Sequence, residues 1–172
     1  MAPKPSDHPD FFKAPPPAGQ SRESRIRLDG EGRFWHEGAL IDRPALQAAL
    51  HRWIGRHPDD GRTILDNGYD WCYLAVDDVP CFVTALTVTD DAVVLTLADG
   101  REEPLDPATL REGPGGALYT RVTRGGPGPA WDAKLTRAAQ AALLPLVVEG
   151  SAAEGGRPWL VVGGRRYPLP SS

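Results

Sequence analysis

The sequence predicts an α+β fold of two small lobes, in which antiparallel hairpins surround one main helix per lobe. The first observation is the abundance of helix breakers: 19 Gly and 18 Pro in 172 residues, roughly twice their usual share. The second is a series of short apolar segments separated by Asp-Gly, Asn-Gly and Gly-Gly pairs, which supply the positive φ of tight hairpin turns. These observations exclude a helical bundle or coiled coil, and they favour hairpins over parallel βαβ crossovers.

Residues 1–24 are predicted to form a disordered, proline-rich arm. Prolines remove backbone donors and favour an extended chain. The arm contains Pro3, Pro5, Pro9, Pro15, Pro16 and Pro17. Only Phe11 and Phe12 offer apolar surface, so the alternative is a docking peptide led by these two side chains.

Residues 25–87 are predicted to form the first lobe, an α+β unit. Alternating residues on both sides of Asp29-Gly30 indicate a hairpin, and further strands are expected at 63–65, 69–76 and 81–88. A helix is predicted over 43–54, because Asp42 can cap it and Pro44 suits its first turn. The apolar residues that share one face of this helix are Leu46, Ala49, Leu50, Trp53 and Ile54.

Trp35 is expected to be a structural side chain rather than a surface for stacking a ligand. It lies on the return strand of the first hairpin, directly before the helix that needs an apolar cover. Its indole N–H would then reach a backbone carbonyl of a nearby Gly turn.

Residues 88–172 are predicted to form the second lobe, which is rich in β-strands. Strands are expected at 92–98 and 117–124, between clusters of Gly and Pro. A helix is predicted over 131–148, with Pro145 bending or ending it. The chain should close with a hairpin over 159–169 that turns at Gly163-Gly164.

A short motif recurs along the chain. Gly100–Leu105 and Gly164–Leu169 share the pattern G-R-x-x-P-L, and Gly38–Asp42 is a looser copy. Leu105–Pro107 also resembles Ile41–Pro44. The recurrence is either chance repetition of turn residues or the mark of a repeated hairpin unit, and the sequence leaves both open.

Composition restricts the class of protein. A net charge of −4 and a pI near 5.5 argue against nucleic acid as the main partner. The apolar runs are too short to cross a membrane, and the N-terminus lacks a signal-peptide pattern, so a cytoplasmic location is expected. Cys72 and Cys81 are interpreted as small hydrophobes in strands. No metal-ligand spacing and no nucleotide-binding motif occurs, so neither metal nor cofactor is expected.

One polar pair stands out as a candidate site. Asp77 and Asp78 follow an apolar strand and could accept from an arginine, bind a cation or act as a base, or could simply form a strand-ending turn. Arg121 and Lys134 are the expected cationic partners, and Tyr73 completes the set of candidate binding residues. The four histidines are expected to be solvated, and no nucleophile motif is present.

The ordered series of motifs resembles the bacterial domain-of-unknown-function family 1285. The matching segments are Leu28-Asp29-Gly30, Phe34-Trp35, Gly38 to Ile41, Tyr73 to Pro80, Tyr119-x-Arg121 and Trp131 to Leu135. They span residues 25–170. The sequence departs from the family pattern at Asp77, where the family usually has Glu, and at Lys134, where it usually has Arg. The stretch Leu105–Leu110 is similar instead to uncharacterised protein family 0598.

The resemblance implies an α+β fold of two lobes with repeated hairpins, and a role in ligand binding or signalling. The function predicted first is therefore a non-catalytic binding module for a small ligand or a protein partner. The alternative is a small enzyme that uses Asp77 or Asp78 as base with Arg121 or Lys134 as anion clamp. The sequence leaves the ligand and the oligomeric state open.

Overall fold

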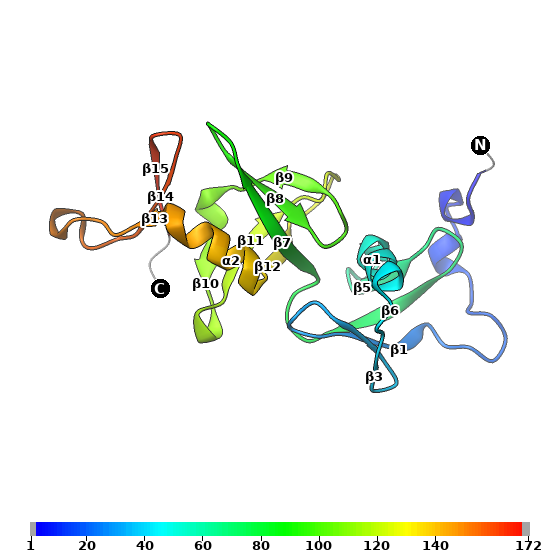
Figure 1. The fold of residues 1–172 in the computed structure, drawn as a ribbon. Coiled ribbons are helices and arrows are strands. Elements are labelled where there is room, and N and C mark those ends of the chain that lie inside the picture. Colours follow the sequence, from blue (N-terminus) through cyan, green and yellow to red (C-terminus); the bar gives the residue numbers. More distant parts are fainter. Residues whose placement is uncertain (1–2, 170–172) are drawn as a thin grey trace. The chain divides into compact units, whose positions relative to one another are not determined.

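The computed structural model describes residues 3–169 and divides into two compact units, Met1–Pro80 and Cys81–Ser172. We call them unit 1 and unit 2, and the course of the chain through each is drawn in Figure 1. The division falls after Pro80, whereas the lobes predicted from the sequence divide after residue 87. Among the described residues, no helix is long and apolar enough to cross a membrane.

Unit 1 contains a six-stranded sheet with the order β3-β2-β1-β6-β5-β4. Its strands are β1 (Glu23–Leu28), β2 (Phe34–His36), β3 (Ala39–Leu40), β4 (Ile54–Arg56), β5 (Thr63–Asp66) and β6 (Trp71–Val76). The first three strands form one antiparallel meander and the last three form another. A parallel pairing of β1 with β6 joins the two meanders, with Leu28 beside Val76.

The first helix confirms the predicted one. Helix α1 spans Pro44–Trp53 and starts on its proline, while Ile54 already belongs to β4. The expected cap is wrong, because Arg43 and not Asp42 takes the N-cap position, and its side chain does not cap the helix. Phe34 is fully buried, and its ring contacts that of His51 on α1 at 4.8 Å between centroids. His51, expected in solvent, is buried because its Nε2 lies 3.0 Å from the carbonyl oxygen of Gly32.

The N-terminal arm, predicted to be disordered, contacts the sheet in this structure. It contains two short 3-10 turns, η1 (Pro5–Asp7) and η2 (Phe11–Lys13). Phe11 is buried together with Ile64 and Trp71, and the Trp71 indole donates to the Phe11 carbonyl at 3.4 Å. The physical reason is that Phe11 packs against Ile64 of β5 and Trp71 of β6, which removes all three apolar side chains from water.

Unit 2 contains a second six-stranded sheet with the order β10-β11-β12-β7-β8-β9. Its strands are β7 (Cys81–Val88), β8 (Val93–Leu97), β9 (Glu102–Pro104), β10 (Arg111–Glu112), β11 (Leu118–Val122) and β12 (Trp131–Leu135). The short turns η3 (Pro107–Thr109) and η4 (Pro114–Gly116) flank β10. Here the parallel pairing joins β7 to β12, with Cys81 beside Ala133.

The predicted helix over 131–148 is wrong in its first third. Residues Trp131–Leu135 form strand β12, and helix α2 covers only Arg137–Leu143, after which η5 (Leu144–Leu146) contains Pro145. Thr136 caps α2 by accepting the Ala139 amide at 3.3 Å. The residues before this cap form a strand and not a helix, because Ala133 and Leu135, at alternate positions, are both buried in the core.

A three-stranded sheet completes unit 2. It consists of β13 (Val147–Val148), β14 (Trp159–Val162) and β15 (Arg165–Pro168), with η6 (Ala152–Glu154) in the loop before β14. The predicted closing hairpin is confirmed, because β14 and β15 pair around Gly163 and Gly164, which both have positive φ. This sheet contributes Leu160 and Val162 to the core of the unit.

The two large sheets have the same topology. In each, a three-stranded meander is followed by a second one, and the first and sixth strands pair in parallel. The recurring motifs lie at matching places: Gly38 and Gly100 turn the second strand into the third, and both have positive φ. Asp42-Arg43-Pro44 starts helix α1, whereas Asp106-Pro107 starts only the short η3.

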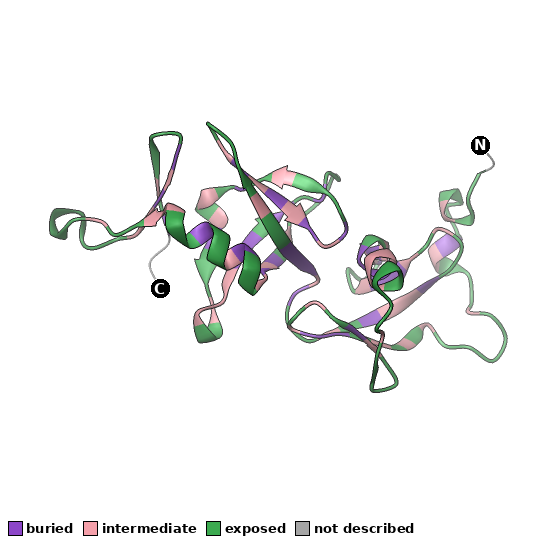
Figure 2. Cartoon of the chain, in the orientation of Figure 1, coloured by how far each residue is buried: buried purple, intermediate pink, exposed green. Residues whose placement is uncertain are grey.

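The predicted α+β class is therefore confirmed, with one correction of detail. The strands are mostly antiparallel, but each large sheet contains a parallel pair that the local hairpin signals do not predict. Buried residues alternate with less buried ones along β8 and β12, whereas β7 begins with three buried residues in succession. Figure 2 shows buried segments in both units. Each unit thus has its own apolar core.

The core position expected for Trp35 belongs to its neighbour Phe34. We expect Phe34→Ala to lower the free energy of unfolding by about 3–5 kcal/mol, because it removes a fully buried ring. Trp35→Ala should cost less, since Trp35 is only half-buried. Urea unfolding of both variants and of the milder Phe34→Leu measures these losses. A larger loss for Trp35→Ala than for Phe34→Ala would contradict this assignment.

Candidate functional site

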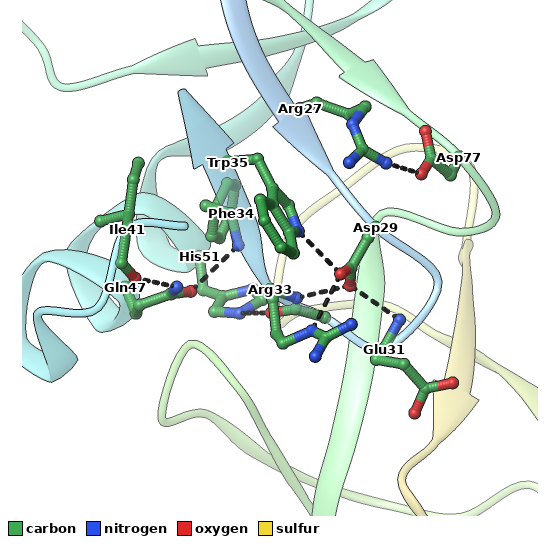
Figure 3. Close-up of polar contacts among 11 residues, drawn as sticks. Arg27, Asp29, Glu31, Arg33, Phe34, Trp35, Ile41, Gln47, His51 and Asp77 are labelled. Atoms are coloured by element: carbon green, nitrogen blue, oxygen red, sulfur yellow. Dashed lines mark hydrogen bonds and ion pairs between the residues drawn. The ribbon is translucent and has the colours of Figure 1, made fainter. Parts of the chain in front are cut away.

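The predicted acidic pair lies at the end of β6, on the surface of unit 1. Asp77 and Asp78 are both exposed. The Asp77 amide donates to the Leu28 carbonyl at 3.0 Å, and its carboxylate forms an ion pair with Arg27 across the parallel strands (Figure 3). Asp77 therefore helps to close the β1–β6 pairing.

Tyr73 lies on the same strand and is held by charged neighbours. Its hydroxyl donates to Asp60 Oδ2 at 2.7 Å, and the Arg62 guanidinium carbon stacks 3.6 Å from its ring centroid. The hydrogen bond to Asp60 raises the pKa of Tyr73 and lowers the pKa of Asp60. Arg62 in turn binds both carboxylate oxygens of Glu23, at 2.7 and 2.9 Å.

The two predicted cations belong to unit 2. Arg121 lies on β11 and its Nε is 3.8 Å from an oxygen of Asp132, its partner on β12. The ammonium of Lys134 lies 5.9 Å from the centroid of the Tyr119 ring. The five predicted residues are thus divided between the two units, and their joint action as one site stays a prediction.

The turn at Asp29-Gly30 contains a carboxylate that is surrounded by hydrogen-bond donors of unit 1. The Asp29 carboxylate accepts the amides of Glu31 and Arg33, the Arg33 guanidinium and the Trp35 indole, all within 2.8–3.0 Å (Figure 3). Burial disfavours the charge, but these four donors outweigh it and lower the pKa of Asp29 to about 2. The indole of Trp35 thus bonds a carboxylate, in place of the turn carbonyl that the sequence suggests.

The pocket that unit 1 offers to a ligand lies elsewhere, beside the first residues of β1. Its volume is about 520 Å³. Its lining comes from the arm, β1, β2, α1, β5, β6 and the loop between the last two strands: Pro16, Pro17, Gly19, Gln20, Ser21, Arg22, Glu23, Ser24, Arg25, Ile26, His36, Leu50, Trp53, Leu65, Asn67, Asp70, Trp71 and Cys72. We call it the arm pocket, because residues of the N-terminal arm form one of its walls.

The arm pocket combines an apolar wall with a half-buried thiol. Leu50 and Leu65 are buried, and the half-buried Trp53 continues the apolar surface from the last turn of α1. Cys72 lies opposite Leu65 in the register of β5 and β6. Ser24 holds the strand beside it, since its hydroxyl donates to the Tyr73 carbonyl at 2.6 Å.

Arg22 fastens the arm to the sheet at the edge of this pocket. Its Nη1 donates to Asp70 at 2.5 Å and to the Trp71 carbonyl at 2.6 Å, and its Nη2 reaches the carbonyl oxygens of Ala14 and Pro15. The guanidinium also stacks over the Trp71 ring at 4.4 Å. One side chain therefore joins the proline segment, the sheet edge and the pocket wall.

The ionisable groups of the arm pocket are either neutral or paired. Burial raises the pKa of the Cys72 thiol, which keeps it protonated and weakly nucleophilic at neutral pH. Arg25 at the rim pairs with Glu37, as Arg22 does with Asp70. Among residues 3–169, no group of three or more His, Cys, Asp or Glu side chains is placed to hold a metal ion.

The sequence contains no signal that would have identified this pocket. Arg22 falls in the arm that was predicted to be disordered, and Cys72 was interpreted only as a small hydrophobe of a strand. That strand placement is confirmed for Cys72 on β6 and Cys81 on β7. His57, expected in solvent, is buried among aromatic rings, with the Trp71 ring centroid at 4.8 Å.

The Asp29 carboxylate should make unit 1 sensitive to acid. Its folded pKa lies below the unfolded value, so its stabilisation is present above pH 4 and is lost as the pH falls towards 2. We expect this contribution to be about 2 kcal/mol. Urea unfolding of the parent and of Asp29→Asn should differ at pH 6 and converge near pH 2. A difference that stays constant over this range would contradict the assignment.

The Cys72 thiol should react slowly and only at high pH. Because its pKa is raised, its alkylation by iodoacetamide should be slower at pH 8 than in the urea-unfolded chain. The rate should still increase above pH 9, where an ordinary thiol levels off. Cys72→Ser, which retains only the buried Cys81, is the control and should not react on this timescale. A plateau below pH 8 would show an activated thiol instead.

Comparisons with known proteins identify the fold. No family model matches the sequence, and no curated protein does. Among solved structures, a DUF1285 family protein from Silicibacter pomeroyi DSS-3 matches with a TM-score of 0.64 at 21% identity, over 98% of this chain and 89% of its own. One from Shewanella baltica OS155 matches with a TM-score of 0.53 at 16% identity, over 73% and 94%. The chain therefore has the fold of the DUF1285 family proteins, whose function is unknown.

Proposed function

We propose that this protein is a binding module for a small molecule, which it holds in the arm pocket of unit 1. The observation that carries the proposal is the pocket itself: about 520 Å³ with an apolar wall and a polar rim. Ligand sites of proteins fall in this range of volume and combine the same two kinds of surface. A small molecule fits such a concavity better than the flat face of a protein partner does.

The lining suggests the chemistry of the ligand. Trp53 with Leu50 and Leu65 offers a surface for an apolar, flat group. The side-chain oxygen of Asn67 already accepts the amides of Tyr69 and Asp70. The NH₂ group of the same side chain can therefore donate hydrogen bonds to a ligand. We therefore expect a compact molecule with one aromatic or aliphatic part and one part rich in hydrogen-bond acceptors.

Binding without catalysis is the role that the groups around the pocket favour. The thiol of Cys72 is held protonated, and the acidic groups Glu23 and Asp70 are engaged by arginines. The shared fold and the motif resemblance support placing the chain as a divergent relative of the DUF1285 proteins. Ligand binding in the arm pocket would also serve the signalling role that the resemblance suggests.

A screen of small aromatic and heterocyclic fragments tests this function. Fragments that bind the arm pocket should raise the melting temperature and slow the alkylation of Cys72 by at least tenfold at saturation. Their effect should disappear in protein already alkylated at Cys72 and weaken in Trp53→Ala. The matched control is Arg121→Ala, at an exposed position of unit 2, which should leave the effect of the fragments unchanged.

Two results would contradict the proposal. One is a set of fragments that stabilise the protein but leave the alkylation rate of Cys72 unchanged. The other is the absence of any fragment that protects Cys72 at millimolar concentration.

A further inference from the structure

A second hollow lies within unit 2 and is distinct from the arm pocket. It has a volume of about 440 Å³ and lies between the β10–β11 edge and the loop before β14. Its lining consists of Leu110, Arg111, Glu112, Leu118, Leu144, Val147, Gly155, Gly156, Arg157, Pro158 and Leu169. We call it the leucine groove.

The interior of the leucine groove is apolar. Leu110 and Leu169 are buried at its base, and Leu118 and Val147 are half-buried along its sides. Leu144 keeps 55% of its surface exposed, although it directly follows helix α2. These apolar side chains line a hollow and remain in contact with water. A ligand that covers them is therefore favoured by the hydrophobic effect.

Arg157 is the cation that the leucine groove offers to a ligand. Its side chain is exposed and forms no ion pair with any described residue, while Arg111 stacks on Tyr119 and donates to Asp132 at 3.3 Å. Glu112 is the acidic residue among those that line the groove. Because Arg111 already pairs with Asp132, Arg157 is the positive charge left for a ligand, and it favours an anionic group.

The loop before β14 leaves the groove open. Gly155 and Gly156 both have positive φ, and a Cβ atom added to either would meet nothing within 4 Å. The backbone therefore turns past the hollow without placing a side chain over it. The groove is accessible beside Arg157 and closed at its base by Leu110 and Leu169.

We propose that the leucine groove binds a monocarboxylate with a linear aliphatic chain. The chain would lie along Leu118, Leu144 and Val147, where its burial supplies the free energy of binding. The carboxylate would pair with the Arg157 guanidinium, whose planar fork matches two carboxylate oxygens. A second copy of the protein is the weaker occupant, because a stable interface needs well over 1,000 Å² and this hollow is small.

Calorimetric titration of the full-length protein with three probes, each with a ten-carbon aliphatic chain, tests the contributions of the ligand's charge and of its aliphatic chain. Decanoate should bind more tightly than decan-1-ol, and decyltrimethylammonium should bind weakest. Arg157→Gln should weaken decanoate about tenfold and leave decan-1-ol unchanged, as expected for one lost charge-assisted contact. Arg165→Gln, on the exposed β15, is the matched control and should change neither.

A second pair of variants tests the apolar surface. Leu144→Asp places a negative charge on an exposed position of the groove and should abolish binding of decanoate and reduce that of decan-1-ol. Val88→Asp, at a similarly exposed position on β7, is its control and should bind both probes like the parent. Because both residues are largely in water, the two variants should fold, and circular dichroism checks this.

Three results would overturn the proposal. The first is equal affinity for decanoate and decyltrimethylammonium. The second is an equal loss of decanoate binding in Arg157→Gln and Arg165→Gln. The third is a dimer, measured by light scattering, that Leu144→Asp dissociates, since a second copy would then cover the groove. None of these results bears on the arm pocket, which is tested through Cys72.

Discussion

The parallel pairing of the first strand with the sixth holds the large sheet of each unit together. In unit 1 it places Leu28 beside Val76, and in unit 2 it places Cys81 beside Ala133. Leu28 and Ala133 are fully buried, so the centre of each sheet is also the centre of its core. This pairing joins two three-stranded meanders, each of which would be only marginally stable alone. In unit 1 it also brings the end of the N-terminal arm to the start of β6, which is where the arm pocket forms.

A buried aspartate in a turn is the second device that the two units share. Asp29 and Asp99 each follow a strand of a large sheet, and each accepts a backbone amide two residues further along the chain. Each carboxylate also binds an arginine in its own turn, and Asp99 binds Arg124 in addition. Burial disfavours both charges, yet these donors lower both pKa values. The carboxylates of Asp29 and Asp99 therefore fix the geometry of their hairpin turns.

Local signals predicted the parts of the fold whose cause is local. The turn at Gly163-Gly164 follows from φ preferences, and helix α1 follows from its initial proline and its apolar spacing. The first hairpin also forms as predicted, although its positive φ lies at Gly32 and not at Gly30. Strand β12 could not be predicted in this way, because Trp131 and Leu135 satisfy both a helical spacing of four and a strand alternation. Only the distant partner strand β7 decides between them. The choice between Phe34 and Trp35 for the core is of the same kind, since both faces of β2 offer an aromatic ring.

The arm pocket shows why a binding site is harder to predict than a strand. Arg22 and Cys72 line one hollow although 50 residues separate them, and neither residue is unusual in its own segment. The local interpretation of Cys72 as a small strand residue is correct, and its raised pKa follows from the burial that this interpretation implies. What the sequence does not show is the empty volume beside it. Pro16 and Pro17 of the arm border that volume, and Arg22 holds this part of the arm by donating to Asp70 and to the carbonyl oxygens of Ala14 and Pro15.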